Sequence, residues 1–224
     1  MGTRVGVVVF PGTNCEMDVV HAVEVLGGTG DLVWHGDTSV AGYDAIVVPG
    51  GFAHGDYLRT GAIARFSPVM EAVRAFAEAG GPVVGICNGF QVLTEAGMLP
   101  GALQKNRGLK FLCTTVELRV DSTDSVLTSE TAEGDVLRVP INHFEGNYTC
   151  SPETLAELRA NEQIVLRYVD NPNGSVDDIS GICNAGRNVV GLMPHPERAV
   201  SDLLGSQDGV PLLRSLLLGA AAKA

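Results

Sequence analysis

The chemistry of this chain centres on a cysteine held between two glycines, in the segment Gly85-Ile86-Cys87-Asn88-Gly89. An apolar run precedes the segment and a helical pattern follows it, so the cysteine falls on a tight turn from strand to helix. The first turn of a helix offers unpaired N–H groups and the positive end of the helix dipole, which favour a thiolate and a developing oxyanion. The pattern predicts Cys87 as a catalytic nucleophile; the alternative is a buried structural cysteine.

A histidine and a carboxylate stand together in a second segment, Pro194-His195-Pro196-Glu197, which directly follows another apolar run. Pro196 biases His195 toward an extended backbone, and residues two apart on an extended segment point to the same side. We therefore expect His195 to act as the base and Glu197 to hold its tautomer and stabilise its protonated form. The alternative is a surface turn in which the histidine is incidental.

A third segment, Pro49-Gly50-Gly51, also ends an apolar run. Ligands of open α/β sheets bind beyond the carboxyl ends of the strands, and a Gly-Gly turn there can aim a backbone N–H at an oxyanion. We expect the N–H groups of Gly51 and Asn88 to form a two-donor oxyanion hole. Taken without the other two segments, it is better interpreted as a plain turn after a strand. Together the three segments predict acyl transfer through a thioester, with the substrate still open.

Short apolar runs and helical patterns alternate along the first half of the chain. Strands are predicted at 4–10, 32–34, 45–48 and 83–86, and helices at 16–26 (capped by Asn14), 68–79 and 88–96. The second half is richer in strands, predicted at 114–120, 135–139, 164–169, 179–183 and 189–193, with helices at 152–160 and 211–221. This order is typical of an open, mostly parallel, doubly wound (flavodoxin-like) α/β sheet with helices on both faces, extended by antiparallel strands in the second half. Residues 1–224 contain no repeat or long linker and are predicted to form one domain.

The composition excludes several classes of protein. The 224 residues carry 26 acidic and 15 basic side chains, a formal net charge of −11, which disfavours binding to nucleic acids or to anionic membranes. The cysteines are odd in number and widely spaced, with neither a C-x-x-C pair nor a zinc-like cluster, so we expect no disulfide framework, no metal and a reducing compartment. Neither a signal peptide nor an apolar run near ~18 residues is present, which predicts a cytoplasmic protein.

The same segments carry a resemblance to a known family. The matching strings are 10–15 (FPGTNC), 49–52 (PGGF), 55–59 (GDYLR), 85–91 (GICNGFQ), 99–103 (LPGAL), 110–111 (KF), 171–175 (NPNGS) and 193–198 (MPHPER). The chain resembles, over nearly its whole length, the class I glutamine amidotransferases that serve as the glutaminase (PurQ type) subunit of phosphoribosylformylglycinamidine synthase.

The resemblance implies a reaction and partners. L-Glutamine is cleaved at Cys87 through a γ-glutamyl thioester, with His195 and Glu197 completing the triad and Gln91 contacting the substrate. The ammonia passes to an ATP-dependent synthetase subunit (PurL type), which converts formylglycinamide ribonucleotide to formylglycinamidine ribonucleotide in purine biosynthesis. A small bridging subunit (PurS type) joins the two. ATP and Mg²⁺ are expected on the synthetase, and no cofactor on this chain.

Two other interpretations stay open at this point. A stand-alone γ-glutamyl cysteine hydrolase would share the cysteine turn and the histidine. A non-catalytic redox-sensing module would need a reactive Cys87 but has no need of the pair formed by His195 and Glu197, which counts against it. His143 is interpreted as a structural residue or a partner contact rather than as a second catalytic histidine.

Overall fold

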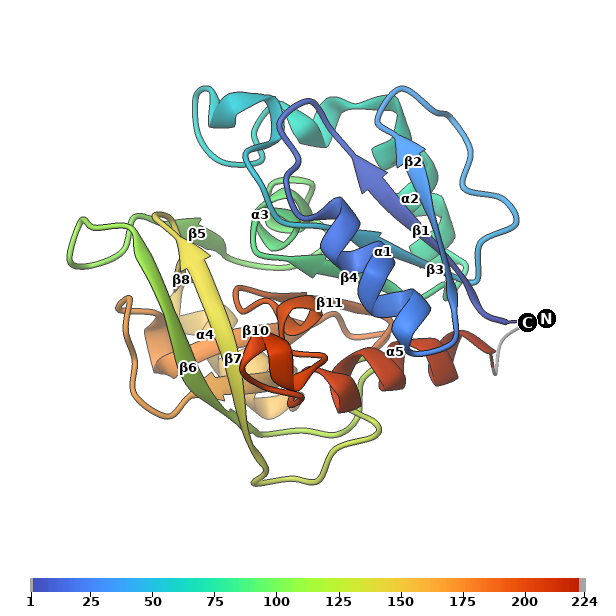
Figure 1. Cartoon of the computed structure of the whole chain (residues 1–224). Helices are drawn as coiled ribbons and strands as arrows, with labels where there is room; N and C mark the ends of the chain where they lie inside the picture. The colour runs from blue at the N-terminus through green and yellow to red at the C-terminus, as the bar shows by residue number, and fades with distance from the viewer. Residues whose placement is uncertain (1, 222–224) are drawn as a thin grey trace.

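A nine-stranded mixed sheet forms the centre of the molecule (Figure 1). The computed structural model describes residues 2–221, and the strand order is β2-β1-β3-β4-β11-β10-β9-β6-β7. The first five strands run parallel: β2 (Thr29–Trp34), β1 (Arg4–Val9), β3 (Ala45–Val48), β4 (Val83–Ile86) and β11 (Val189–Leu192). The order β2-β1-β3-β4 is that of flavodoxin-like sheets. The predicted α/β fold is therefore confirmed.

The second half of the chain continues the sheet with antiparallel strands, also as predicted. These are β10 (Ile179–Cys183), β9 (Ile164–Tyr168), β6 (Leu112–Val120) and β7 (Val136–His143). A separate two-stranded ribbon of β5 (Ala102–Gln104) and β8 (Asn147–Thr149) was not predicted. Strands of three residues are too short to show an alternating pattern.

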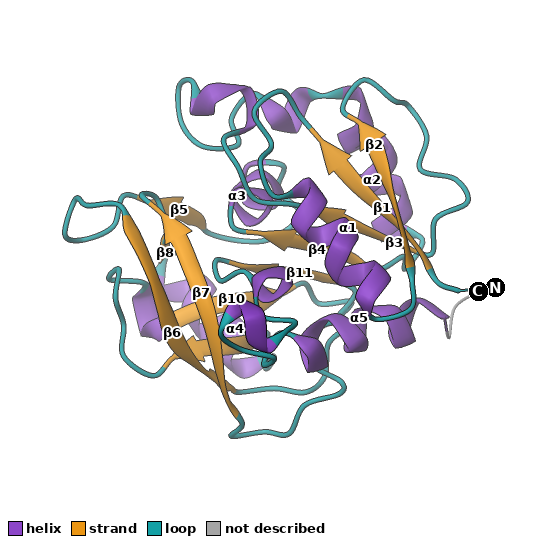
Figure 2. Cartoon of the chain, viewed as in Figure 1, coloured by secondary structure: helices purple, strands orange, loops and turns teal. Residues whose placement is uncertain are grey.

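Helices cover both faces of the parallel strands (Figure 2). α1 (Glu16–Val25) and α5 (Val210–Ala221) contact each other on one face, and α2 (Pro68–Glu78) and α3 (Asn88–Glu95) lie on the other. α4 (Pro152–Ala160) belongs to the antiparallel half. The expected capping of α1 by Asn14 is wrong: Cys15 occupies the cap position, no side chain caps the helix, and the N–H of Asn14 donates to the Gly50 carbonyl.

Aliphatic side chains on the parallel strands form the core between the helix layers. Every residue of β3 and β4 is buried, as expected for short apolar runs covered on both faces. Each fully buried Val or Ile stabilises the fold by about 1.5–3 kcal/mol relative to an exposed one. No helix within residues 2–221 has the length and apolarity of a membrane span.

The parallel strands bring the sequence motifs to one edge. β1, β3, β4 and β11 are neighbours in the sheet and point the same way, so the residues that follow them emerge side by side. Those residues are Cys15, the Gly50-Gly51 turn, Cys87 and His195. The topology alone therefore assembles the candidate site at the carboxyl edge of the sheet.

A glycine in the first turn of α3 lets this helix lie close to β3. A Cβ on Gly89 would lie 1.8 Å from the carbonyl oxygen of Val48, so alanine must push helix and strand apart. We expect Gly89→Ala to lower the free energy of unfolding by about 1–3 kcal/mol or more, measured by urea denaturation. Gly108→Ala is the control, because a Cβ there meets nothing within 4 Å; its effect should stay within about 0.5 kcal/mol. Equal stability of the two variants would contradict this account of the packing.

Candidate active site

Cys87 sits on a backbone conformation that side-chain-bearing residues rarely adopt, with φ 52° and ψ −105°. Such strain persists only where surrounding contacts hold it, and it concentrates at functional sites. Here the N–H of Cys87 donates to the Leu192 carbonyl of β11 over 2.8 Å, and α3 begins at the next residue. The thiol is 95% buried, and its sulfur lies 3.6 Å from the carbonyl oxygen of Asn142 at the end of β7.

The glycines around the turn are required by close approach. A Cβ on Gly85 would lie 2.7 Å from the carbonyl carbon of Gly89. A third glycine, Gly50, makes room at the neighbouring strand end: a Cβ there would lie 2.8 Å from Cε1 of His195 and 3.0 Å from Sγ of Cys15. The site is therefore compact because backbone, rather than side chain, separates its members.

His195 and Glu197 form a buried pair. Nδ1 of His195 lies 2.6 Å from Oε1 of Glu197, and both side chains are about 99% buried. The N–H of His195 donates to the Pro140 carbonyl of β7, which fixes the backbone of the segment. Burial alone would lower the pKa of His195, but charge interaction with Glu197 and Cys87 and contacts to Cys15 and Cys87 raise it well above its ordinary value. The buried imidazole therefore holds its proton more tightly than an ordinary histidine does.

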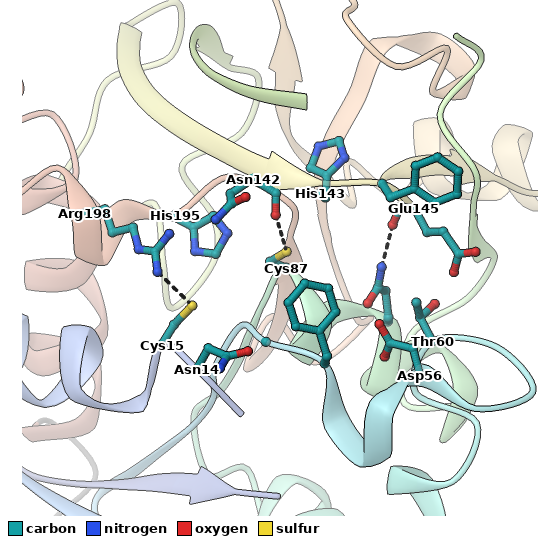
Figure 3. Close-up of a pocket in the computed structure, with 14 residues that line it drawn as sticks. Asn14, Cys15, Asp56, Thr60, Cys87, Asn142, His143, Glu145, His195 and Arg198 are labelled. Carbon is teal, nitrogen blue, oxygen red and sulfur yellow. Dashed lines mark hydrogen bonds between the residues drawn. The ribbon is translucent and has the colours of Figure 1, made fainter. Parts of the chain in front are cut away.

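A pocket of about 430 Å³ opens beside Cys87 (Figure 3). Its lining residues come from the ends of β1, β3, β4, β11 and β7, and from the segment 52–60. They are Asn14, Cys15, Gly51, Phe52, Asp56, Thr60, Cys87, Gln91, Asn142, His143, Phe144, Glu145, His195 and Arg198. The pocket holds the thiol and the imidazole together.

One wall of the pocket is acidic and belongs to a hydrogen-bond network. The amide nitrogen of Asn88 donates to Oε1 of Gln91 over 2.8 Å and to Oδ1 of Asp56 over 3.3 Å, and Nε2 of Gln91 donates to the carbonyl of Glu145. Burial and the nearby charge of Glu145 raise the pKa of Asp56 to about 6, against a smaller lowering by Asn88. Within residues 2–221, no basic side chain is found hydrogen-bonded or ion-paired to Asp56 or Glu145. Such an unbalanced pair of carboxylates suits a cationic group of a ligand.

The two predicted oxyanion donors, Gly51 and Asn88, are placed differently relative to the pocket. Gly51 lines it, with a φ of 146° that a side chain would rarely adopt. Asn88 is 98% buried and its side chain serves the network behind the pocket, while its N–H lies in the first turn of α3, where helix geometry provides no acceptor. Their role as oxyanion donors stays a prediction.

His143 lines the pocket but is held as a structural residue. Its Nδ1 lies 3.1 Å from Oδ1 of Asn106, and burial followed by the nearby charge of His195 lowers its pKa to about 4. A neutral imidazole with so low a pKa is a poor proton carrier near neutral pH.

Sequence reasoning about chemistry missed several pocket residues. Cys15 and Asp56 stood inside matching strings, but nothing in their local pattern pointed to a site. Glu145 and Arg198 follow segments whose approach to the pocket depends on the sheet order. The only signal was their position in the connections that follow predicted strands.

Comparisons with known proteins show the family to which the chain belongs. Residues 2–208 match the family model described as a CobB/CobQ-like glutamine amidotransferase domain. The chain is 58% identical over 217 residues, 97% of this chain and 99% of the other, to the phosphoribosylformylglycinamidine synthase subunit PurQ of Rubrobacter xylanophilus.

Solved structures show the same fold. A chain in the structure of PurLQS from Thermotoga maritima superposes with a TM-score of 0.91 at 42% identity, covering 98% of this chain and 99% of that one. A putative GMP synthase protein from Thermoplasma acidophilum gives a TM-score of 0.71 at 16% identity, covering 100% and 96%, and shares the fold alone. The chain therefore belongs to the family of glutamine amidotransferase domains that includes the PurQ subunits of phosphoribosylformylglycinamidine synthase.

Proposed function

We propose that the chain is the glutaminase subunit of a phosphoribosylformylglycinamidine synthase. It hydrolyses L-glutamine to glutamate and ammonia, and the ammonia is used by an ATP-dependent synthetase subunit of the PurL type to make formylglycinamidine ribonucleotide from formylglycinamide ribonucleotide. A bridging subunit of the PurS type completes the assembly. The observation that carries the proposal is the strained Cys87 turn opening into a pocket beside a buried His195–Glu197 pair, in a chain 58% identical to a PurQ subunit.

In the first half-reaction Cys87, as the thiolate left after its proton has passed to His195, attacks the side-chain amide carbon of glutamine. A C–S bond forms and the amide oxygen takes the electron pair of the C=O bond, where the N–H groups of Gly51 and Asn88 stabilise it. His195 donates its proton to the departing nitrogen, and ammonia leaves as the C–N bond breaks. The raised pKa of His195 keeps this proton available at neutral pH, and Glu197 stabilises the imidazolium beforehand.

In the second half-reaction water hydrolyses the thioester. The now neutral His195 takes a proton from water as the oxygen attacks the carbonyl carbon. The C–S bond breaks, Cys87 leaves as thiolate, and glutamate is released with His195 again protonated. The cycle consumes one glutamine and one water and needs no metal or redox partner.

The acidic wall selects the free amino acid. Asp56 and Glu145 bind the α-ammonium group of glutamine. In the Asn88–Gln91 network, Asn88 donates to the Asp56 carboxylate and Gln91 donates to the backbone carbonyl of Glu145. The pairing restores the ionised form of Asp56, whose pKa burial and Glu145 raise to about 6 in the empty pocket.

The loop 52–61 transmits docking of the synthetase to the pocket. It carries the exposed apolar side chains of Phe52, Tyr57 and Leu58. Arg59 makes a two-pronged ion pair with Glu95 on α3, the helix that begins beside Cys87. The subunit acts in the cytoplasm. Reducing conditions there keep cysteines as thiols, and all five cysteines of the chain are free.

The first prediction concerns Cys87. In the reconstituted complex Cys87→Ser should abolish glutamine-dependent synthesis but leave synthesis from added ammonium salts intact, because only the supply of ammonia is lost. Cys113→Ser, which changes an exposed cysteine, should preserve both rates. Loss of ammonia-dependent synthesis in Cys87→Ser would assign the residue a structural role, and robust hydrolysis of γ-glutamyl peptides by the isolated wild-type chain would favour a stand-alone hydrolase.

The second prediction concerns Asp56. Because its pKa is about 6 and only the ionised form attracts an ammonium group, kcat/KM for glutamine should rise as the pH rises through that value. Asp56→Asn should remove this rise and increase KM about 10- to 150-fold, the equivalent of a charged hydrogen bond of about 1.5–3 kcal/mol. Asp202→Asn, an exposed carboxylate, is the matched control. An unchanged KM in Asp56→Asn would sink the assignment of the acidic wall.

The third prediction concerns Arg59. Arg59→Ala should leave the basal glutaminase rate of the isolated chain unchanged and reduce its stimulation by the synthetase, measured as the ratio of the two rates. Arg4→Ala is the matched control, since it breaks a similar exposed ion pair, with Asp31, at the other end of the sheet. Stimulation of Arg59→Ala that is unchanged from the wild type would show that the loop 52–61 does not transmit docking.

A further inference from the structure

A second cysteine lies inside the pocket, and the proposed mechanism gives it no task. Cys15, His195 and Glu197 are all buried, and each offers one potential metal-ligand atom, the three atoms lying within 4.8 Å of one another. Cys15 precedes α1, whereas His195 and Glu197 follow β11. In Figure 3 the sulfur of Cys15 lies near His195 and apart from Cys87.

We propose that Cys15, His195 and Glu197 form an inhibitory site for a thiophilic divalent cation of the Zn²⁺ type. Thiolate, imidazole nitrogen and carboxylate oxygen are the three ligand classes that zinc takes from proteins, and zinc with three protein ligands keeps a fourth position open. Cys15 and His195 line the pocket, so the open position faces it; Glu197 does not line it.

Unpartnered atoms support the assignment. Nε2 of His195 and Oε2 of Glu197 are buried and have no hydrogen-bond partner within residues 2–221. Buried polar atoms without partners are costly, and a cation is one group that offsets this cost. The remaining atoms of the pair bond each other over 2.6 Å, a separation that must widen when a metal is bound.

The charges of the trio match a divalent cation. Binding releases one proton from Cys15 and one from the His195 imidazolium to solvent, so one thiolate and one carboxylate neutralise the two positive charges in a buried place. Arg198 opposes the cation, because its guanidinium donates to the Cys15 sulfur over 3.1 Å. It also donates to Asp18 over 2.9 Å, so it keeps an anionic partner when it moves aside. This competition makes the site weaker than a four-ligand structural zinc site, and its occupancy reversible.

A metal bound at this site would stop catalysis by blocking His195, the residue that carries the proton. A metal-bound His195 neither gives a proton to the leaving nitrogen nor takes one from water, while Cys87 stays chemically intact. Inhibition therefore rests on the proposed role of His195, whereas metal binding does not.

Cobalt(II) replaces zinc in the binding test because it reports its ligands. Addition of Co²⁺ to the full chain, reduced and free of metals, should produce sulfur-to-cobalt charge-transfer absorption in the near ultraviolet and the visible bands of a four-coordinate ion. Cys15→Ser should lose the charge-transfer band, whereas Cys87→Ser and Cys113→Ser should keep it. A band that is absent from the wild type, or that disappears with Cys87 or Cys113 instead of Cys15, would overturn the proposal.

Glutaminase assays then test the consequence. Zn²⁺ should inhibit the wild-type chain and a chelator should restore it, while Cys15→Ser, normalised to its own metal-free rate, should require at least about tenfold more Zn²⁺ for half-inhibition. Equal sensitivity of the two proteins would overturn the assignment of Cys15. Cobalt binding through Cys15 without inhibition would uphold the site and refute instead the catalytic role of His195.

Discussion

The candidate site depends on the pairing of β4 with β11. These strands are distant in the sequence but parallel neighbours in the sheet, with Ile86 opposite Leu192, and the hydrogen bond from Cys87 N–H to the Leu192 carbonyl extends the pairing by one residue. The strained turn and the histidine segment therefore leave the sheet from adjacent points. A shift in register would separate thiol and imidazole and turn side chains to the opposite faces.

The charge at the site is organised by the same edge. A protonated imidazole is unfavourable in a buried position, and here it is sustained by Glu197 and by the cysteines around it. The opposite wall carries two carboxylates with no basic side chain bound to them in residues 2–221. One side of the pocket therefore carries His195, which supplies a proton, and the other carries Asp56 and Glu145, which attract a cation. This arrangement fits a substrate with an amide at one end and an ammonium group at the other.

Much of the fold could be predicted because its strands are short, apolar and punctuated by glycine and proline. β3, β4, β10 and α4 begin and end at the predicted residues. The nucleophile and its histidine–glutamate pair could be proposed because each stands in a local pattern with a physical reason. Cys15, Asp56 and Glu145 could not be given roles, because their proximity depends on the order of strands in the sheet. The same limit explains why the spacing of cysteines indicated no metal site, although the fold places a thiol, an imidazole and a carboxylate together.

The antiparallel half of the sheet adds contacts to the site that the parallel strands assemble. Solved structures at 16% and 15% identity share the fold, with TM-scores of 0.71 and 0.59, and a fold by itself does not specify a chemistry. β7 contributes what that core lacks: its Pro140 carbonyl holds the backbone of His195, its Asn142 carbonyl lies against the thiol, and the residues after it supply Glu145. The strand at one edge of the sheet order therefore contacts residues that follow the central strands β4 and β11. Because β7 contacts nucleophile, base and acidic wall together, a change in its position would alter binding and proton transfer at once, while leaving the buried parallel core in place.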